Sequence, residues 1–341
     1  MSIKYKILVT GGTGYIGSHA TVQLIKAGFE VIILDNLCNS KLTVLERIQS
    51  ITGHYPEFIN GDIRDKKTLA DLFSKYKIHG VLHFAGLKAV GESEKHPLKY
   101  YDNNVLGSIN LIEAMSLAGV NTIVFSSSAV VYGNTSDVQY TENMPLNPIN
   151  TYGHNKKMVE DFLRDIFRSN NRWGIALLRY FNPIGAHNSG LIGEDPNQLP
   201  NNLLPLIAQV AVNQRNEVLV FGNDYNTPDG TGLRDYIHVE DLVRGHILAL
   251  EKILSKPSLL TLNLGSGRAY SVLEVIRAFE KASSKKIPFK FTNRRDGDLA
   301  EYFANASLAN KTLGWKPQYD LDRMCEDSWR WQSNNPLGFP G

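Results

Sequence analysis

The sequence has 341 residues, of which 43% are hydrophobic and 21% are charged, and its formal net charge is +2. This length allows two domains, or one large domain with an added lobe. A balanced charge without a lysine or arginine cluster gives no indication of nucleic acid or an anionic membrane as a partner. We see no signal peptide and no apolar stretch of about 18 residues, so we expect a cytoplasmic protein without membrane spans.

The first part of the chain alternates short apolar runs with longer helical patterns. Helices are expected up to about residue 27, near 103–118 and from Tyr152 onward. Apolar strands that are each followed by a helix are typical of a parallel sheet covered on both faces. We therefore predict an α/β fold with a Rossmann-type, doubly wound parallel sheet. Its strands are expected at residues 6–10, 30–35, 58–63, 80–86, 121–128 and 174–182.

The composition of the sequence changes after Asn182, where the expected loops become longer and richer in Pro, Gly and Asn. This change predicts a smaller, mixed α/β lobe that binds the substrate. We expect a nucleotide-binding domain at residues 1–180 and the substrate lobe at 181–341, with segments of the second returning to the first.

A glycine turn follows the first strand. Gly11, Gly14 and Gly17 have G-x-x-G-x-x-G spacing in "TGGTGYIGSH", between a strand and a helix. Such a turn brings backbone amides and a helix N-terminus close to a pyrophosphate. Asp35 ends the second strand, where a carboxylate accepts hydrogen bonds from ribose hydroxyls and repels an additional phosphate. We therefore predict NAD, in preference to NADP, as the cofactor.

Asp62 follows the third predicted strand in "GDI". It either binds the adenine amino group or caps the next helix.

Polar residues that could carry chemistry follow the fifth strand. Ser126, Ser127 and Ser128 end that strand, and Tyr152 and Lys156 lie four residues apart on the next helix, hence on one face. A nearby cation lowers the pKa of a phenol, so we expect Lys156 to favour the phenolate of Tyr152 as a general base. Ser128 is expected to bind the substrate hydroxyl.

These motifs resemble the extended short-chain dehydrogenase/reductase family, and within it the nucleotide-sugar 4-epimerases. The resemblance extends over nearly the whole chain through "HFAGLKAVGES", "FSSSAVVYG", "LLRYFNPIGAH", "GEDP", "DGTGLRDYIHV" and "RRDGDL". It implies reversible interconversion of UDP-glucose and UDP-galactose through a transient 4-keto sugar, with NAD bound throughout.

The resemblance also implies a set of cofactor contacts. They are Gly11, Gly14, Tyr15, Ile16, Gly17, Asp35, Asn36, Asn39, Ser40, Asp62, Ile63, Phe84, Ala85, Gly86, Lys88, Asn103, Ser126, Tyr152, Lys156 and Tyr180, with Phe181 near the nicotinamide.

The second lobe needs cations, amides and an apolar wall to bind a nucleoside diphosphate. Arg234 and Arg295 are expected to bind phosphates, because guanidinium groups match phosphate oxygens, and Phe221 is expected to stack on uracil. The complete predicted substrate set is Lys88, Ser128, Tyr152, Asn182, Asn202, Leu203, Phe221, Arg234, Tyr236, Arg295, Asp298 and Tyr302.

The resemblance implies that Tyr302 lies at the position that determines the width of the sugar pocket in this family. A bulky ring there disfavours an N-acetyl group, although activity on UDP-N-acetylglucosamine stays an alternative. A 4,6-dehydratase is a second alternative. Its relatives carry Asp and Glu after the residue matching Ser128, where this chain has Ala129 and Val130. A non-catalytic dinucleotide sensor is a third, but it would not need Tyr152 and Lys156 together.

Other features are expected to be structural. The cysteines and histidines show no spacing typical of metal ligands, so no metal is predicted. The resemblance suggests a homodimer formed by the helices near 103–118 and 152–168.

Overall fold

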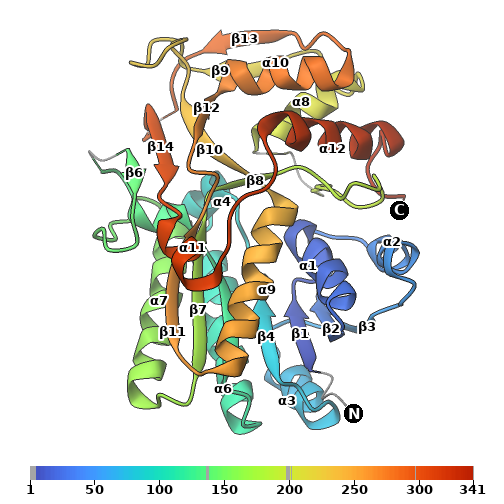
Figure 1. Ribbon diagram of the computed structural model, residues 1–341, viewed down its shortest axis with the longest axis vertical. Coiled ribbons are helices and arrows are strands. Elements are labelled where there is room, and N and C mark those ends of the chain that lie inside the picture. The colour runs from blue at the N-terminus through green and yellow to red at the C-terminus, as the bar shows by residue number, and fades with distance from the viewer. Residues whose placement is uncertain (1–4, 136–137, 197–199, 201, 296, 341) are drawn as a thin grey trace.

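The computed structural model describes residues 5–135, 138–196, 200, 202–295 and 297–340. A large sheet with helices on both sides forms one part, and short strands and helices form a smaller lobe beyond its carboxyl edge (Figure 1). This arrangement confirms the predicted α/β fold.

The large sheet has seven parallel strands in the order β11-β7-β5-β4-β1-β2-β3. Its strands are β1 (Lys6–Thr10), β2 (Glu30–Asp35), β3 (Glu57–Asn60), β4 (Gly80–His83), β5 (Thr122–Ser128), β7 (Gly174–Tyr180) and β11 (Leu259–Leu264). The six predicted strands are present, but β3, β4 and β7 end before the predicted bounds. After β3 the chain crosses to β4 on the other side of β1, so the strand order reverses between β1 and β4, which is the switch point where such sheets bind ligands.

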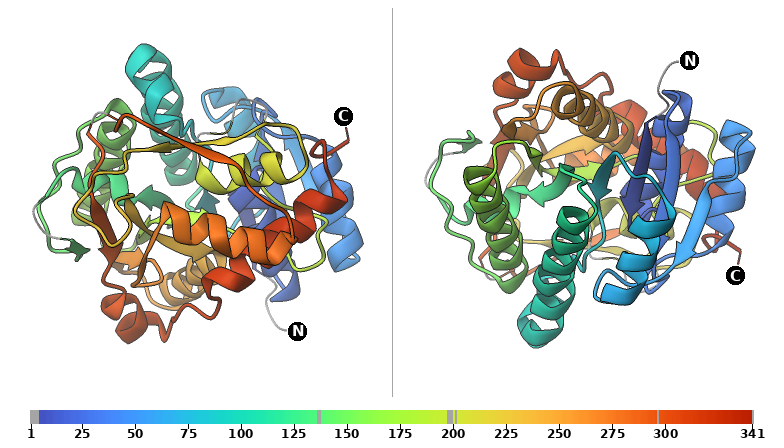
Figure 2. Two further views of the ribbon diagram at one scale, coloured as in Figure 1. Left: turned by 90° about the horizontal axis from the view of Figure 1, so that it is seen from above. Right: turned by 90° about the horizontal axis from the view of Figure 1, so that it is seen from below.

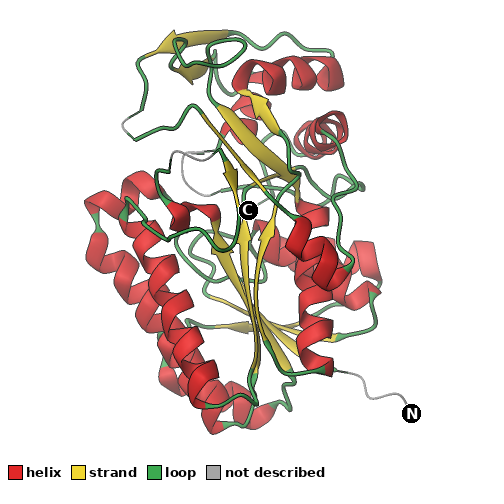
Figure 3. Cartoon of the chain, turned by 60° about the vertical axis from the view of Figure 1, so that its left-hand side comes forward, coloured by secondary structure: helices red, strands yellow, loops and turns green. Residues whose placement is uncertain are grey.

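Two layers of helices cover the sheet (Figure 3). One layer contains α1 (Tyr15–Lys26), α2 (Thr43–Thr52) and α9 (Val239–Ser255), whose apolar side chains share a core with alternate strand residues such as Ile7 and Val9. The other contains α3 (Lys66–Lys75), α6 (Gly107–Leu117) and α7 (Thr151–Ser169), which pack on Leu8 and its neighbours. Burying both faces explains the continuous apolar strands.

The segment predicted as one helix at 103–118 begins as a π-helix and continues as an α-helix. A π-helix, η1 (Tyr101–Leu106), precedes α6, and the short helices α4 (Val90–Lys95) and α5 (Pro97–Tyr100) lead into it. The π turn places Asn103 at the cavity described below.

The smaller lobe has a sheet in the order β12-β10-β14-β6, with β8 paired to β10, and a separate β9–β13 pair. Its strands are β6 (Gln139–Tyr140), β8 (Asn182–Ile184), β9 (Val218–Phe221), β10 (Leu233–His238), β12 (Ala269–Ser271), β13 (Phe289–Thr292) and β14 (Glu301–Ala304). Its helices are α8 (Leu203–Ala211), α10 (Val272–Ser283) and α12 (Leu321–Asn334), which enclose a separate apolar core. The short helix η2 (Ala129–Tyr132) packs with Tyr140 and Phe181, and α11 (Ser307–Leu313) packs against α9 and β11 of the large sheet.

Strand pairing crosses the division predicted at residue 180. Helix α9 and strand β11 return to the large sheet, and β6, which comes before that residue, pairs with β14. The two lobes therefore interleave along the chain, and the division at 180 stays a prediction.

Within the described ranges, no helix is long and apolar enough to span a membrane.

Candidate active site

The glycine turn brings β1 and α1 into close contact. Gly11 has a φ of +70°, which favours glycine, and a Cβ on Gly17 would lie 2.1 Å from the carbonyl oxygen of Gly11. No side chain caps the start of α1 at Gly14. The first amides of the helix are thus available to an anion.

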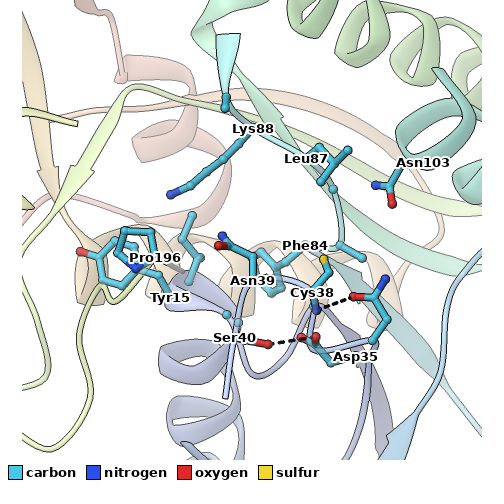
Figure 4. Close-up of a pocket in the computed structure, with 18 of the residues that line it drawn as sticks. Tyr15, Asp35, Cys38, Asn39, Ser40, Phe84, Leu87, Lys88, Asn103 and Pro196 are labelled. Carbon is cyan, nitrogen blue, oxygen red and sulfur yellow. Dashed lines mark hydrogen bonds between the residues drawn. The ribbon is translucent and has the colours of Figure 1, made fainter. Parts of the chain in front are cut away.

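A cavity of about 350 Å³ extends from this turn to Tyr152 and Lys156. All but two of the predicted cofactor residues line it: Gly11, Gly14, Tyr15, Ile16, Gly17, Asp35, Asn36, Asn39, Ser40, Asp62, Ile63, Phe84, Ala85, Gly86, Lys88, Asn103, Tyr152, Lys156 and Tyr180. In Figure 4, Asp35 and Ser40 lie on one side of this space and Lys88 lies across from them.

The carboxylate of Asp35 is held at the end of β2. It accepts hydrogen bonds from the backbone amides of Thr13 at 3.1 Å and Leu37 at 2.9 Å, and from the Ser40 hydroxyl at 3.1 Å. These donors fix its direction at the cavity wall, where ribose hydroxyls would bind.

Asp62 does not cap the next helix, because Asp65 does so by accepting from the amide of Lys67. Instead, Asp62 accepts hydrogen bonds from Arg64 and, at 2.8 Å, from the amide of Asn36. The hydrogen bond from Arg64 is the largest cause that lowers the pKa of Asp62 to about 2. The capping alternative is therefore wrong, and a charged carboxylate lies at this end of the cavity.

Tyr152 and Lys156 lie on the face of α7 that packs against β5. The Asn150 side chain caps the helix by accepting from the amide of Gly153 at 2.8 Å. The ammonium of Lys156 donates to the carbonyl oxygen of Ser126 at 2.7 Å, and the phenol of Tyr152 hydrogen-bonds to the Ser128 hydroxyl. The end of β5 thus holds both side chains.

Burial dominates the acidity of this pair. It raises the pKa of Tyr152 well above its usual value, and the Ser128 hydrogen bond opposes that rise. Burial also lowers the pKa of Lys156 to about 8, while the charge of Glu160 acts in the opposite direction. In the protein without a ligand, desolvation of the phenolate therefore outweighs the Ser128 hydrogen bond, and the expectation that Lys156 favours the phenolate of Tyr152 in the loaded site stays a prediction.

Two predicted cofactor residues are not part of the cavity wall. Ser126 is buried, its hydroxyl lies 3.0 Å from a ring nitrogen of His246, and its side chain hydrogen-bonds to Tyr180. Phe181 packs against the rings of Tyr140 and Tyr302 in a cluster at the junction of the lobes. Their predicted places at the cofactor therefore stay predictions.

The predicted substrate residues fall into two groups. Lys88, Tyr152 and Asn202 line the cavity, and Ser128 contacts Tyr152. The others do not line it, and they come from β8, α8 and the strands and loops of the smaller lobe: Asn182, Leu203, Phe221, Arg234, Tyr236, Arg295, Asp298 and Tyr302.

Several residues of the second group contact one another. The guanidinium of Arg295 lies 3.9 Å from the centroid of the Phe221 ring, so it covers part of the ring that was expected to meet uracil. Arg234 forms an ion pair with Asp298 at 3.0 Å and lies 4.7 Å from the Tyr302 ring. Each of these two arginines thus lies against an aromatic ring, and the charge of Arg234 is balanced by Asp298.

Three others are engaged in structural contacts. The Asn182 amide donates to the carbonyl oxygen of Asp235 at 2.8 Å. Tyr236 lies in the apolar core of the lobe, where burial raises the pKa of its hydroxyl, and Leu203 packs against the same core. The predicted contacts of these three residues with the substrate stay predictions.

Sequence reasoning missed one wall of the cavity. Glu194, Asp195, Pro196 and Pro200 reach it from the segment after β8. Glu194 accepts from the ammonium of Lys88 at 2.8 Å and from Asn202 at 3.1 Å. The motif "GEDP" was the available signal, but nothing local in it indicates that it meets the glycine turn.

A second set of missed residues comes from the first domain. It consists of Leu34, Cys38, Gly61, Arg64, Leu87, Ala89, Glu92, Lys99 and Tyr100.

A strand–glycine–helix turn, an acidic residue ending β2 and a Tyr–Lys pair at the end of β5 define a dinucleotide-binding protein of the dehydrogenase type. The chain matches the family model "GDP-mannose 4,6 dehydratase" over residues 8–328. It is 58% identical over 335 residues to the UDP-glucose 4-epimerase of Neisseria meningitidis serogroup C, covering 98% of this chain and 99% of that relative. The epimerase of Bacillus subtilis (strain 168) is 54% identical, with 98% of each chain covered.

Solved structures of UDP-glucose 4-epimerases are also similar to this chain. A UDP-glucose 4-epimerase from Stenotrophomonas maltophila, with bound NAD and formylated UDP-arabinopyranose, has a TM-score of 0.95 at 52% identity, covering 97% of this chain and 98% of that one. The enzyme from Bifidobacterium longum, in complex with NAD+ and UDP, has a TM-score of 0.95 at 48% identity, covering 98% and 100%. The chain therefore belongs to the family that the GDP-mannose 4,6 dehydratase model describes, and within it to the UDP-glucose 4-epimerases.

Proposed function

We propose that the protein interconverts UDP-glucose and UDP-galactose by inverting the sugar C4 through a transient 4-keto sugar, with NAD retained between turnovers. One observation carries this proposal: a single cavity joins a pyrophosphate-type glycine turn to Tyr152 and Lys156. The similarity to UDP-glucose 4-epimerases supports the choice of reaction.

The cavity fits a dinucleotide. Side chains at Gly11 or Gly17 would collide with the backbone, so the turn leaves the close approach that a pyrophosphate needs. Asp35 would hold the adenosine ribose, Asp62 the adenine end, and Lys156 the nicotinamide ribose. NAD held by these residues would supply the hydride acceptor for the sugar C4 and, once reduced, the hydride donor for the opposite face.

Tyr152 is the proposed general base and acid. It takes the proton of the 4-hydroxyl as the carbonyl forms and gives it back as the alcohol forms again, so no net redox change occurs. Lys156 stabilises the phenolate by its charge, and Ser128 orients the hydroxyl by a hydrogen bond. Because burial disfavours the phenolate, further positive charge in the cavity is needed for this step.

The smaller lobe is the proposed holder of the uridine diphosphate. Arg234 and Arg295 bind its phosphates, and Phe221 contributes to the wall for the base. A diphosphate fixed there leaves the 4-keto sugar able to turn about its linkage. Tyr302 narrows the sugar site, which favours UDP-glucose and UDP-galactose over the N-acetylated sugars.

The family model also names a dehydratase, but the site does not favour that reaction. Removing water across C5 and C6 requires an additional acid and base. The two residues after Ser128 are Ala129 and Val130, which begin η2 and carry no group that transfers protons. We therefore keep epimerisation as the proposed reaction.

We also propose that the protein is a homodimer. Exposed apolar side chains line one stripe of η1 and α6 at Leu106, Ile109 and Leu117, and Met158 is exposed on α7. Helices α6 and α7 run beside each other on the outside of the sheet (Figure 2). A second copy that covers this stripe would remove it from water as a four-helix contact.

The test separates epimerisation from its alternatives. Purified protein is denatured and its supernatant assayed for NAD, and native protein is incubated with UDP-galactose. We expect stoichiometric NAD and formation of UDP-glucose without net NADH. Accumulation of free NADH, or of a 4-keto-6-deoxy sugar, would contradict the proposal.

A further inference from the structure

A buried carboxylate lies one turn beyond Lys156 on α7 and has no part in the proposed chemistry. Glu160 is 0% exposed. Tyr152, Lys156 and Glu160 recur every four residues, so they lie along one helix face. A buried carboxylate is costly unless cations and hydrogen bonds compensate for the lost water. The partners of Glu160 therefore reveal what this position does.

Those partners tie α7 to two strands of the sheet. Arg179 on β7 donates two hydrogen bonds, from Nε to Oε1 at 2.9 Å and from Nη2 to Oε2 at 2.6 Å. The hydroxyl of Ser127 on β5 donates to Oε1 at 2.6 Å, and Arg164 on α7 donates to Oε2 at 3.0 Å. Ser127 and Arg179 are partners in the strand register. One carboxylate thus joins α7, β5 and β7.

Ser127 stands between the two residues that hold the catalytic pair. The carbonyl of Ser126 accepts from Lys156 at 2.7 Å, and the hydroxyl of Ser128 bonds to Tyr152. A displacement of α7 along β5 would disturb all of these contacts at once. Glu160 opposes such a displacement, because its bidentate pair with Arg179 fixes both direction and distance.

We propose that Glu160 is a positioning residue of this site: with Ser127 and Arg179 it fixes Tyr152 and Lys156 against the end of β5 and supplies the negative charge next to Lys156. This inference rests on the proposed function.

The charged groups around Lys156 agree with this role. His83 on β4 faces it, and burial, followed by the charge of Lys156, lowers the pKa of His83 to about 3, so this ring is neutral. Burial keeps Tyr152 protonated in the protein alone. Burial raises the pKa of Glu160, but hydrogen bonds and charge from Arg179 outweigh it, so the pKa lies below its usual value. Glu160 is thus the anion that opposes the effect of burial on Lys156.

The experiment compares three variants of the NAD-loaded protein. Glu160→Gln removes the charge and keeps an acceptor for Ser127, but it leaves the buried charge of Arg179 without its carboxylate, although Arg179 still donates to Tyr132 and to the carbonyl oxygen of Glu142. Glu160→Gln/Arg179→Gln neutralises both groups and so avoids the unpaired guanidinium. Arg164→Gln is the matched control, because it removes one hydrogen bond to Glu160 and keeps the carboxylate.

We expect the alkaline limb of the kcat–pH profile to move to lower pH by about one unit in both Glu160 variants, and not in Arg164→Gln. KM for UDP-galactose should stay within about twofold, because Glu160 lies outside the cavity wall. The pKa of Lys156 should fall by the same amount as the alkaline limb. It is measured by carbon NMR on protein labelled at lysine Cε, and the Lys156 signal is assigned by its loss in Lys156→Met.

A double variant whose alkaline limb and Lys156 titration match those of the wild type would overturn the proposal, and the epimerase activity of the wild type would be unaffected by that result. A wild type that does not convert UDP-galactose would overturn the proposed function instead. The NMR titration would still test the influence of Glu160. If Glu160→Gln fails to fold, the double variant supplies the decisive comparison.

Discussion

At the scale of single residues, the balance between burial and charge decides how the phenol works. Tyr152 is 8% exposed, and burial alone keeps its proton in place. Lys156 is also buried and makes its hydrogen bond to a backbone carbonyl. We therefore expect Tyr152 to act as a base only when positive charge from the bound cofactor is present in the cavity.

Replacing Tyr152 tests this role. Tyr152→Phe removes the proton acceptor and keeps the ring, so kcat should fall about 10²- to 10⁴-fold while bound NAD and UDP affinity persist. Turnover of UDP-galactose and NAD content are the measurements. Tyr101→Phe, which changes a tyrosine on η1 outside the cavity, should keep the wild-type rate. Equal turnover in both variants would remove Tyr152 from the mechanism.

At the scale of elements, the segment 187–196, called the strap below, contributes Glu194, Asp195 and Pro196 to one wall of the cavity. The Asp195 carboxylate accepts from the ammonium of Lys41 at 3.1 Å and from the amide of Phe339 at 2.8 Å. The ring of Trp331 packs on Phe339 with centroids 4.5 Å apart. The C-terminal segment and the loop before α2 thus hold the strap in place.

Loosening the strap should weaken cofactor retention. Asp195→Ala removes both hydrogen bonds and should raise the rate of NAD loss about tenfold, since a cavity wall that is held less firmly retains a ligand less well. NAD remaining after gel filtration is the measurement. Asp224→Ala breaks an exposed ion pair with Arg294 in the other lobe and serves as the control. Identical retention in the two variants would show that the strap does not retain NAD.

At the scale of the whole molecule, buried neutral histidines predict sensitivity to acid. Burial lowers the pKa of His19 and His83 to about 3 and that of His246 to about 4. The unfolded chain binds protons at these residues near pH 6.5, whereas the folded protein does not. The folded state is therefore fully favoured above about pH 6.5 and loses stability as the pH falls from there toward 4.

Each such histidine should contribute up to about 1.4 kcal/mol per pH unit within that window. Thermal unfolding followed between pH 7.5 and 5 should show a Tm that falls with acid. His246→Asn should reduce the slope of Tm against pH. The control His54→Asn, at an exposed histidine, should leave that slope unchanged. A Tm that does not change over the window would contradict the account.

The proposed dimer is also testable at this scale. Ile109→Asp places a charge in the exposed stripe of α6 and should convert the dimer to a monomer. Leu219→Asp, at an exposed leucine of β9 in the smaller lobe, is the control. Analytical ultracentrifugation measures both. A wild type that sediments as a monomer, or an Ile109→Asp protein that stays dimeric, would refute this interface.

The parts of the fold that depend on short-range patterns could be predicted from the sequence. The apolar strands, the glycine turn with Asp35, and the four-residue spacing of Tyr152 and Lys156 each depend on neighbouring residues. The place of β11 in the sheet could not be predicted, because "LLTLNL" reads as a strand but its neighbour β7 is set by the crossover of the chain. Likewise, Glu194 reaches Lys88 only through tertiary packing.

Burial explains the remaining differences. Tyr236 and Ser126 are polar residues that lie in packed surroundings, which their sequence motifs do not indicate. Burial likewise sets the direction of the Tyr152 pKa in the protein without a ligand. Sequence spacing shows which charges are near, but it does not show how much water has been excluded from around them.

The central claim is that the sugar C4 gives up its hydrogen to a cofactor that stays bound and receives the same hydrogen back. UDP-galactose carrying deuterium at C4 tests this most directly, with the product analysed by mass spectrometry and NMR after reaction in ordinary water with excess unlabelled NADH. We predict UDP-glucose that retains the deuterium at C4. Product with protium at C4, from solvent or from added NADH, would contradict the account.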